Sequence, residues 1–443
     1  MKIAIRKTLY IILSAAFVLM QCGCNVNIQP HDETVSNDEP KASFKEETSD
    51  ETEISDNSRA LRDIIASSGG LGENAICGCC INSMNVNDEK LMELVSKHFN
   101  AVTLENELKP DALFGYCNDA PPSGNIREEE INGISVKVPA LDFSRADAVL
   151  DKILELNDTN PDRIIKVRGH VLVWHSQTPE WFFHVDYDSL KDYVTPEEMN
   201  LRLEWYIRSV LDHYTSKESR YHGLFYGWDV VNEAVSDRGG SYRTDAEQGK
   251  DSLSDSIHSS KSSWWKVYGD NSYIINAFRY ANLYAPEDLL LFYNDYNECD
   301  KTKQKGIISL IEDVKSAEGT RLDGFGMQGH YTVYAPTADR IKEAASAYIE
   351  AAGMVMITEW DVKPSMLYDG TDEGLPKEYE RQKKYYGQIY DALRELYDEG
   401  QNIAGFTFWG VCDKYTWLGN SAHPLLFDED YKEKPAFEAF VSE

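Results

Sequence analysis

The chain has 443 residues, of which 44 are Lys or Arg and 75 are Asp or Glu, so its formal net charge at pH 7 is −31. This acidity argues against nucleic acid or another polyanion as the ligand, because phosphate backbones are bound by basic surfaces. Hydrophobic residues make up 42% of the chain, and a single α/β barrel could use most of this length.

Residues 1–24 predict an export signal. A few basic residues come first, and the apolar run at 9–20 that follows has the size of a signal-peptide core and is short for a membrane span. The next residues are "QCGC", in which Cys22 or Cys24 could be lipidated after cleavage and tether the protein to a bacterial membrane. Plain secretion is the alternative. In both cases we expect an exported protein, extracellular or on the cell surface.

Residues 25–57 predict a disordered acidic linker, because they are polar and lack both apolar periodicity and aromatic density. Such a spacer would hold a domain clear of the cell envelope. Residues 58–443 predict one folded catalytic domain, which we expect to be monomeric.

Within this domain, apolar runs typical of buried strands alternate with amphipathic helical patterns. Strand–helix alternation repeated about eight times predicts a single (β/α)8 TIM barrel of the α/β class. The predicted strands are residues 75–81, 101–104, 164–174, 225–231, 289–293, 324–327, 354–358 and 403–408.

Two of the predicted helices carry clear start signals. One begins at Ser144, and Asp147 is placed to support its cap. The other has Thr195 as N-cap, Pro196 at the first helical position and Glu198 completing a capping box. These signals predict where two of the helices around the barrel begin.

The "CGCC" run at residues 77–80 could suggest a metal site. No second cysteine pair or nearby histidine completes a zinc set, and the flanking sequence is typical of a strand. We therefore predict that these cysteines are buried in the core, and we expect no metal or other cofactor.

Two predicted loops are long, residues 115–140 and residues 236–263. Long loops at the catalytic face of a barrel usually shape the substrate site. The second loop follows the fourth predicted strand and is rich in Ser, Asp and Gly. The first could instead be a tolerated surface insertion.

Polar and aromatic residues gather where the predicted strands end. In a barrel, catalytic groups lie at the carboxyl ends of the strands, so these residues are expected to converge at one mouth. They are Glu105, Asn106 and Lys109; His170, Trp174, His175 and Gln177; Asn232 and Glu233; Asn294, Asp295, Tyr296 and Asn297; Gln328 and His330; Glu359 and Asp361; Trp409 and Trp417.

Two glutamates stand out in this set, Glu233 after the fourth strand and Glu359 after the seventh. We expect them to face each other across the barrel mouth. Paired carboxylates in a cleft are the machinery of glycoside hydrolysis, in which one protonates the leaving oxygen and the other attacks the anomeric carbon or activates water. This chemistry needs no metal.

The neighbouring residues fit this chemistry. His330 could hydrogen-bond a carboxylate nucleophile and hold it ionised, with Asp361 behind it, and Asn232 could bind the sugar 2-hydroxyl. Flat apolar faces for sugar rings are offered by Trp174, Trp409 and Trp417, and hydroxyl partners by Asn106, Lys109, His170 and Gln177.

Seven ordered motifs resemble those of glycoside hydrolase family 10, the endo-β-1,4-xylanases. They are "VTLENELK", "VRGHVLVWHSQ", "WDVVNEA", "YNDYN", "GFGMQGH", "ITEWD" and "FWGVCDKYTW". The resemblance runs from about residue 61 to residue 437 and so covers essentially the whole folded part.

The resemblance implies a retaining mechanism, with Glu233 as general acid/base and Glu359 as nucleophile about 5–5.5 Å apart. One departure is Trp360, where the family usually has Leu; we expect it to point to the other side of its strand and to change packing only. The motifs imply glycone-side sugar contacts at Glu105, Asn106 and Lys109, and further cleft positions at His170, Trp174, Gln177, Asn232, Asn294, Tyr296, Gln328, His330, Trp409 and Trp417.

Three other functions are open to this sequence. A related barrel hydrolase could prefer glucan, if the C6 hydroxymethyl group fits near Lys109, Gln177 and Trp409. A surface sugar-binding lipoprotein on an inactive enzyme fold would not need both glutamates. A structural envelope protein would not need polar and aromatic groups at the strand ends. We therefore predict xylan as the substrate.

Overall fold

The computed structural model describes residues 60–122, 126–246, 261–366, 368, 370–371, 373–419 and 421–441. The predictions for residues 1–24 and 25–57 and the central part of the 236–263 loop lie outside these ranges. Residues Ser58–Glu443 form one compact unit. Within the described ranges, no helix is long and apolar enough to cross a membrane.

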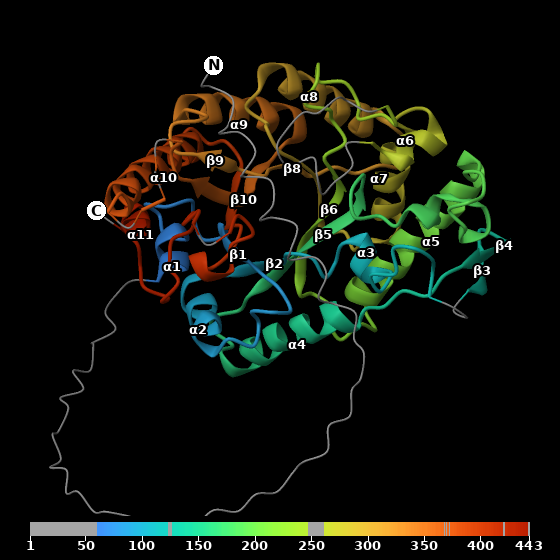
Figure 1. Ribbon diagram of the computed structural model, residues 1–443, viewed down its shortest axis with the longest axis horizontal. Helices are drawn as coiled ribbons and strands as arrows, with labels where there is room; N and C mark the ends of the chain where they lie inside the picture. Colours follow the sequence, from blue (N-terminus) through green and yellow to red (C-terminus); the bar gives the residue numbers. More distant parts are fainter. Residues whose placement is uncertain are drawn as a thin grey trace, which may run out of the picture. The chain divides into compact units, whose positions relative to one another are not determined.

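Among the described residues, parallel strands close into an eight-stranded barrel through the pairing of the first and last strands, β1 and β11, which confirms the predicted TIM-barrel class (Figure 1). Every predicted strand is present, and the fourth, fifth and seventh extend further than predicted. In order around the barrel they are β1 (Ile76–Ile81), β2 (Ala101–Leu104), β5 (Lys166–Trp174), β6 (Phe225–Asn232), β7 (Leu290–Asp295), β8 (Gly324–Met327), β10 (Val355–Lys363) and β11 (Ile403–Phe408).

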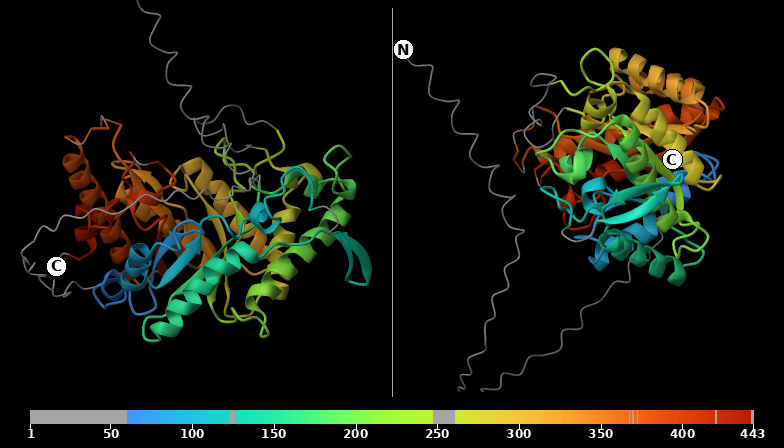
Figure 2. Two further views of the ribbon diagram at one scale, coloured as in Figure 1. Left: turned by 60° about the horizontal axis from the view of Figure 1, so that its bottom comes forward. Right: turned by 90° about the vertical axis from the view of Figure 1, so that its right-hand side faces the viewer.

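Helices surround the barrel, as the views in Figures 1 and 2 show. Short 3-10 turns, η1 (Glu180–Phe183), η2 (Val185–Tyr187) and η3 (Asp413–Tyr415), lie in the loops. The helices are α1 (Leu61–Ile65), α2 (Glu89–His98), α3 (Pro110–Leu113), α4 (Ser144–Thr159), α5 (Pro196–Thr215), α6 (Ser263–Tyr268), α7 (Ser272–Tyr284), α8 (Lys301–Ser316), α9 (Ala338–Ala352), α10 (Leu375–Asp398) and α11 (Pro435–Val441).

Helix α5 begins as predicted, but its capping box is only half formed. The Thr195 hydroxyl accepts a hydrogen bond from the Glu198 peptide N at 3.3 Å. The Glu198 carboxylate pairs instead with Arg202, one turn further along the helix. The Arg202 guanidinium therefore binds the Glu198 carboxylate in place of the Thr195 peptide N–H, which that carboxylate would bind in a complete capping box.

Helix α4 begins at Ser144 as predicted, but Asp147 does not support its cap. The Ser144 peptide N is bound by Asp142 Oδ1 at 3.0 Å. Asp147 Oδ1 instead lies 3.0 Å from His213 Nε2 on the neighbouring helix α5. The prediction was wrong because it considered only local partners, whereas packing of the two helices supplied a tertiary one.

The 115–140 segment is not a plain loop, because it contains an antiparallel hairpin of β3 (Arg127–Ile131) and β4 (Ile134–Val138). Its turn is Asn132–Gly133, with φ of 52° and 77°, the left-handed pair that an Asn-Gly hairpin turn requires. The buried side of the hairpin packs against α5, and the hairpin lies at the edge of the molecule (Figure 1). The Asn-Gly signal between alternating residues was visible in the sequence.

The core packing agrees with two sequence predictions. Trp360 is fully buried, and its ring stacks on Phe408 with centroids 5.4 Å apart, away from the cleft. Cys77, Cys79 and Cys80 are also buried, and burial raises the pKa of each thiol. The "CGCC" run is therefore a core strand.

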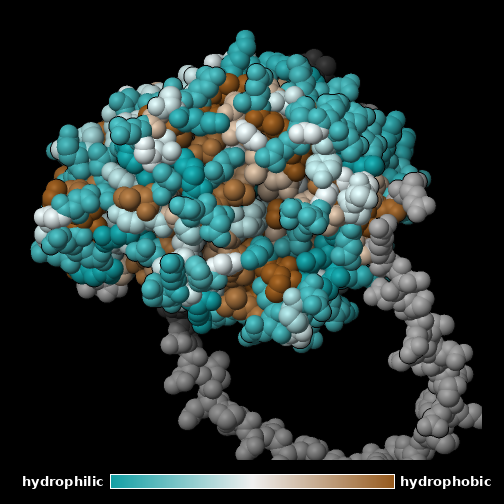
Figure 3. All heavy atoms as spheres, turned by 180° about the vertical axis from the view of Figure 1, so that it is seen from behind, coloured by the Kyte–Doolittle hydropathy of each residue, from teal (hydrophilic) through white to brown (hydrophobic). Residues whose placement is uncertain are grey.

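The face in Figure 3 is mostly hydrophilic, with apolar residues in small, separate patches.

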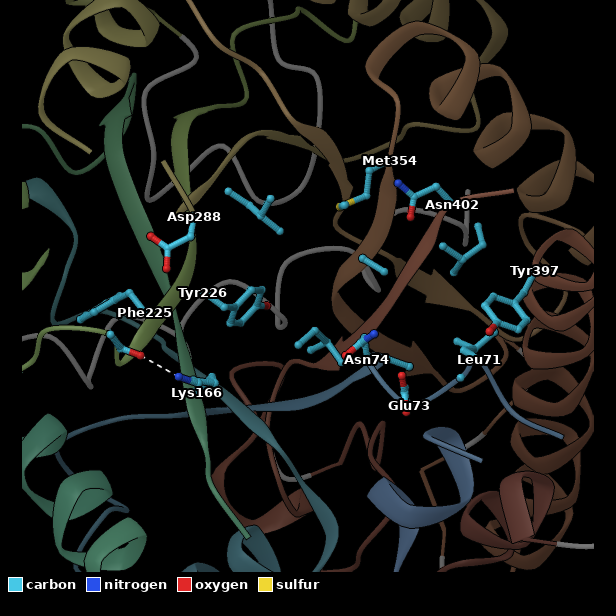
Figure 4. A pocket seen from close by; sticks show the side chains of 17 residues that line it. Leu71, Glu73, Asn74, Lys166, Phe225, Tyr226, Asp288, Met354, Tyr397 and Asn402 are labelled. Atoms are coloured by element: carbon cyan, nitrogen blue, oxygen red, sulfur yellow. Dashed lines mark hydrogen bonds between the residues drawn. The ribbon is translucent and has the colours of Figure 1, made fainter. Parts of the chain in front are cut away.

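A hollow of about 610 Å³ opens at the amino ends of the barrel strands, where Lys166 Nζ donates to the Gly223 carbonyl at 2.7 Å (Figure 4). The predicted site residues lie at the opposite, carboxyl ends, which is where barrels carry their chemistry.

Candidate active site

Glu359 lies in the middle of β10, which continues past it to Lys363, and is held as an anion. It is 5% exposed, and its two carboxylate oxygens have different partners: Oε2 lies 3.1 Å from His330 Nε2, and Oε1 accepts from Asn294 Nδ2 at 2.8 Å. Burial raises the pKa of this carboxyl, but hydrogen bonds and charge from His330, His170 and Asn294 outweigh burial and lower the pKa. An ionised carboxylate with little water around it can act as a nucleophile.

His330 links this carboxylate to Asp361. Its Nδ1 lies 2.9 Å from Asp361 Oδ2, which also accepts from Trp417 Nε1 at 2.8 Å. Burial lowers the pKa of His330, but the carboxylates of Asp361 and Glu359 outweigh burial and raise the pKa to about 10. At neutral pH the imidazole is therefore a cation between two carboxylates, and it donates from both ring nitrogens.

Glu233 directly follows β6 and is surrounded by hydrogen-bond donors. Trp174 Nε1 donates to Oε2 at 3.0 Å. Gln328 Nε2 and Asn232 Nδ2 donate to Oε1 at 2.9 Å and 3.1 Å. The indole of Trp174 thus binds the Glu233 carboxyl group through its N–H. The sequence predicted only its flat face as a surface for sugar rings.

Two amides join the glutamates across the barrel. Asn294 Nδ2, which donates to Glu359, also contacts Asn232 Oδ1 at 3.0 Å, and Asn232 Nδ2 in turn donates to Glu233. Thr358 Oγ1 donates to Asn294 Oδ1 at 2.6 Å and orients that amide. The register of β6, β7 and β10 therefore fixes the two carboxyl groups relative to each other.

A second polar group lies after β2. Lys109 Nζ donates to Asn106 Oδ1 at 3.2 Å and lies 5.1 Å from the Trp174 ring centroid. Because Trp174 donates to Glu233, these polar side chains are connected to Glu233 through the indole. Glu105 Oε2 accepts from Asn82 Nδ2 at 2.6 Å. Asn82 was not among the predicted site residues, although it directly follows β1 and the strand-end rule applied to that strand would have found it.

His170 is fixed from inside the barrel. Its Nδ1 lies 3.0 Å from Asp229 Oδ2, and Asp229 Oδ1 pairs with Arg168 at 2.5 Å; all three residues are buried. Sequence reasoning missed Arg168 and Asp229 because they lie within strands, where a charge is normally costly unless it is paired. Their pairing leaves His170 beside Trp409, with ring centroids 5.5 Å apart.

Trp409 and Trp417 flank His330. Their ring centroids lie 6.4 Å and 5.1 Å from the His330 ring. Trp409 is buried and Trp417 is 51% exposed. The two indoles therefore form an aromatic wall beside the Glu359 carboxylate, of which Trp417 is the solvent-facing part.

Two predicted residues make their contacts outside the glutamate network. Gln177 Nε2 donates to Asp111 Oδ2 at 3.1 Å. The Tyr296 hydroxyl donates to Asp237 Oδ2 at 2.5 Å, and Lys303 Nζ lies 3.7 Å from the Tyr296 ring centroid. Neither hydrogen bond is made to Glu233 or Glu359. Tyr296 nevertheless lies near Glu233, because burial and the Glu233 charge raise the pKa of its hydroxyl.

The arrangement can perform a two-carboxylate displacement at an acetal carbon. An anion supported by an imidazolium lies across from a carboxyl group that is surrounded by neutral donors, and amides and indoles complete the walls. Within the described residues, no group of three His, Cys, Asp or Glu side chains is arranged to hold a metal ion.

Comparison with known proteins places this geometry in context. The glycosyl hydrolase family 10 model matches residues 67–443. Endo-1,4-β-xylanase Y of Acetivibrio thermocellus is 34% identical over 375 residues, which are 82% of this chain and 31% of that protein. The endo-1,4-β-xylanase of Geobacillus stearothermophilus is 33% identical over 369 residues, which are 81% of this chain and 93% of that protein.

A solved structure shows the same fold. The CBM22-1 and GH10 modules of the N-terminal endo-1,4-β-D-xylanase 10B of Clostridium thermocellum, complexed with xylohexaose, superpose with a TM-score of 0.70. The sequence identity is 31%, and the match covers 87% of this chain and 67% of that one.

Proposed function

The chain belongs to glycosyl hydrolase family 10, and we propose that it is an endo-1,4-β-xylanase that cleaves internal β-1,4-xylosidic bonds of xylan. The observation that carries this proposal is the pair formed by Glu359, ionised beside His330, and Glu233, surrounded by the donors of Trp174 and Gln328. The reaction proceeds with retention by double displacement.

In the first step, a Glu359 carboxylate oxygen attacks the anomeric carbon and forms a covalent xylosyl-enzyme. Glu233 gives its proton to the glycosidic oxygen, so that the leaving sugar departs as a neutral alcohol. The imidazolium of His330 and the amide of Asn294 hold the attacking carboxylate in place.

In the second step, Glu233, now a carboxylate, takes a proton from water. The water oxygen attacks the anomeric carbon from the opposite side, and the bond to Glu359 breaks, which restores both glutamates. Because Glu359 must be ionised and Glu233 protonated for the first step, we expect the pH profile of the reaction to be bell-shaped.

The side walls of the site bind the sugars. Glu105, Asn106 and Lys109 present polar groups after β2 for sugar hydroxyls, on the glycone side by similarity to the family, and Asn82 after β1 donates a hydrogen bond to Glu105. Trp409 and Trp417 present apolar indole faces to sugar rings. Further contacts to the bound xylan come from His170, Trp174, Gln177, Asn232, Asn294, Tyr296 and Gln328.

Product analysis with purified protein tests the function. Wild-type protein should release xylo-oligosaccharides from xylan with retained anomeric configuration by NMR, and act far less on carboxymethyl-cellulose. Glu359→Ala should abolish reducing-sugar release. Full activity of that variant would contradict the assignment of the nucleophile, and preference for the cellulose derivative would identify a glucanase.

We also propose that the chain is exported and tethered to the cell surface through Cys22 or Cys24. The basic residues, the apolar run at 9–20 and the following "QCGC" support this proposal. Labelling with a palmitate analogue should mark wild-type protein, and substitution of the lipidated cysteine should abolish the label. Unlabelled protein in the culture medium would support plain secretion instead.

A further inference from the structure

Glu233 has a main-chain conformation that few residues other than glycine adopt. Its φ is 55°, and a conformation of this kind persists only where the surrounding structure fixes it. On the amino side, the Glu233 peptide N donates to the Asn294 carbonyl at 2.9 Å. On the carboxyl side, the Glu233 carbonyl oxygen accepts from Arg243 Nε at 2.9 Å. The N–H of the same peptide group, that of Ala234, donates to the Tyr293 hydroxyl at 3.0 Å. Two of these three anchors are therefore side chains, and Arg243 is the one that binds the Glu233 carbonyl.

A tight hairpin brings Arg243 back to Glu233. An antiparallel bridge joins Val235 to Tyr242, and the Arg243 peptide N donates to the Ala234 carbonyl at 2.8 Å. At the tip, Gly240 has a φ of 62° and packs so closely on the main chain of α8 that a Cβ atom would not fit. The position of Arg243 is thus set by the scaffold and not by Glu233 itself.

Arg243 is a buried cation. It is 4% exposed, and its Nη2 lies 3.4 Å from the Tyr296 hydroxyl. Burial lowers the pKa of its guanidinium, but the Tyr296 hydroxyl and the carboxylates of Glu233 and Asp295 outweigh burial and raise the pKa. The side chain therefore stays charged, and its planar guanidinium donates to the Glu233 carbonyl.

We propose that Arg243 is a positioning residue for the acid/base: it fixes the main chain of Glu233, so that the carboxyl group stays beside Trp174 and Gln328 in position to donate its proton. This inference rests on the proposed function and deepens it. Loss of Arg243 should impair proton donation to the leaving group more than sugar binding or attack by Glu359, whose supports come from other strands.

The test compares two aryl β-xylobiosides, because acid catalysis matters only when the leaving group is poor. Phenol leaves poorly and needs the proton, whereas dinitrophenol leaves without it. For Arg243→Gln, kcat/KM on the phenyl substrate should fall by about tenfold or more, since a positioned acid contributes roughly 10²–10⁴-fold. On the dinitrophenyl substrate kcat/KM should change by less than about threefold, while kcat and KM should fall together if the second step, in which Glu233 acts as the base, is slowed. Arg243→Lys keeps the charge but not the planar donor, so its kcat/KM on the phenyl substrate should lie between those of wild type and Arg243→Gln.

Arg202→Lys is the matched control. Arg202 is also buried, and its Nη1 also donates to main-chain carbonyls, those of Phe182 at 2.7 Å and His184 at 3.0 Å, but it does not contact Glu233. This variant should lose stability without changing the ratio of the two kcat/KM values. Glu233→Ala gives the largest change in that ratio, and the dinitrophenolate burst counts active enzyme in every preparation.

Equal losses on both substrates, or no loss on either, would overturn the role of Arg243. If Arg243→Gln does not fold, Arg243→Lys decides in the same way. A Glu233→Ala protein with an unchanged ratio would reject Glu233 as the acid, and wild-type protein inactive on xylan and on both xylobiosides would reject the proposed function itself.

Discussion

The Nε1 atom of Trp417 donates a hydrogen bond to Asp361 Oδ2 at 2.8 Å, the same oxygen that lies 2.9 Å from His330 Nδ1. An indole that is half exposed at the barrel mouth is thereby connected to Glu359, the proposed nucleophile, through one carboxylate and one imidazolium. A sugar that moves Trp417 would therefore act on the group that supports the nucleophile.

Trp417→Phe separates these two roles of the indole. The variant keeps an aromatic face for the sugar but loses the N–H that binds Asp361. We expect kcat on xylan to fall by about threefold to tenfold with little change in KM, because a lost hydrogen bond to a charged group is worth about 1.5–3 kcal/mol, only part of which acts on the nucleophile. Trp417→Ala should also raise KM. A rise in KM alone for Trp417→Phe would show that the N–H does not support the nucleophile.

Asp361→Asn should change the pH dependence of activity. Without the Asp361 charge, the pKa of His330 should fall from about 10 toward the ordinary 6.5, so the imidazolium is lost at lower pH. Glu359 then loses its cationic partner, and the alkaline limb of kcat/KM should move to lower pH. NMR titration of the histidine side chains measures the same shift directly. A His330 imidazole that still titrates near pH 10 in Asp361→Asn would contradict the role of the Asp361 charge in raising its pKa.

The raised pKa of His330 also predicts how stability depends on pH. A group whose pKa is raised by folding stabilises the protein fully below its unfolded pKa, about 6.5, and this contribution is lost as the pH rises through its folded pKa, about 10. The difference in Tm between wild type and His330→Asn should therefore shrink steadily from pH 6.5 to pH 10. A difference that stays constant or grows over this range would contradict the protonated state of His330.

Trp360→Leu should affect stability and not chemistry. The Trp360 ring is fully buried and stacks on Phe408, so a smaller side chain leaves a cavity that costs about 2–4 kcal/mol of unfolding free energy. Urea denaturation measures this loss, and kcat/KM on xylan should stay within about twofold of wild type at 25 °C. Trp360→Phe is the control and should lose less stability. A large fall in activity of folded Trp360→Leu protein would show that this position shapes the cleft.

Sequence patterns predicted the barrel and most of the residues at its mouth. The apolar runs were long enough to identify every barrel strand. Because the carboxyl ends of parallel strands must meet at one mouth, the positions of Glu233 and Glu359 along the chain were enough to pair them. The same rule would have given Asn82 after β1. The hairpin at Asn132–Gly133 was also visible as a turn signal, although it was interpreted as a loop.

The sequence by itself determined the fold class, the residues at the mouth and, through the family motifs, the chemistry, because strand and helix periodicity and motif order are properties of neighbouring residues. Only the tertiary structure decided the partners: Asp147 with His213, Trp174 with Glu233, and Arg243 with the Glu233 carbonyl. These pairs depend on strand register and on how loops fold back over the barrel. Register and loop closure are set by the packing of the whole chain, and no local spacing encodes them.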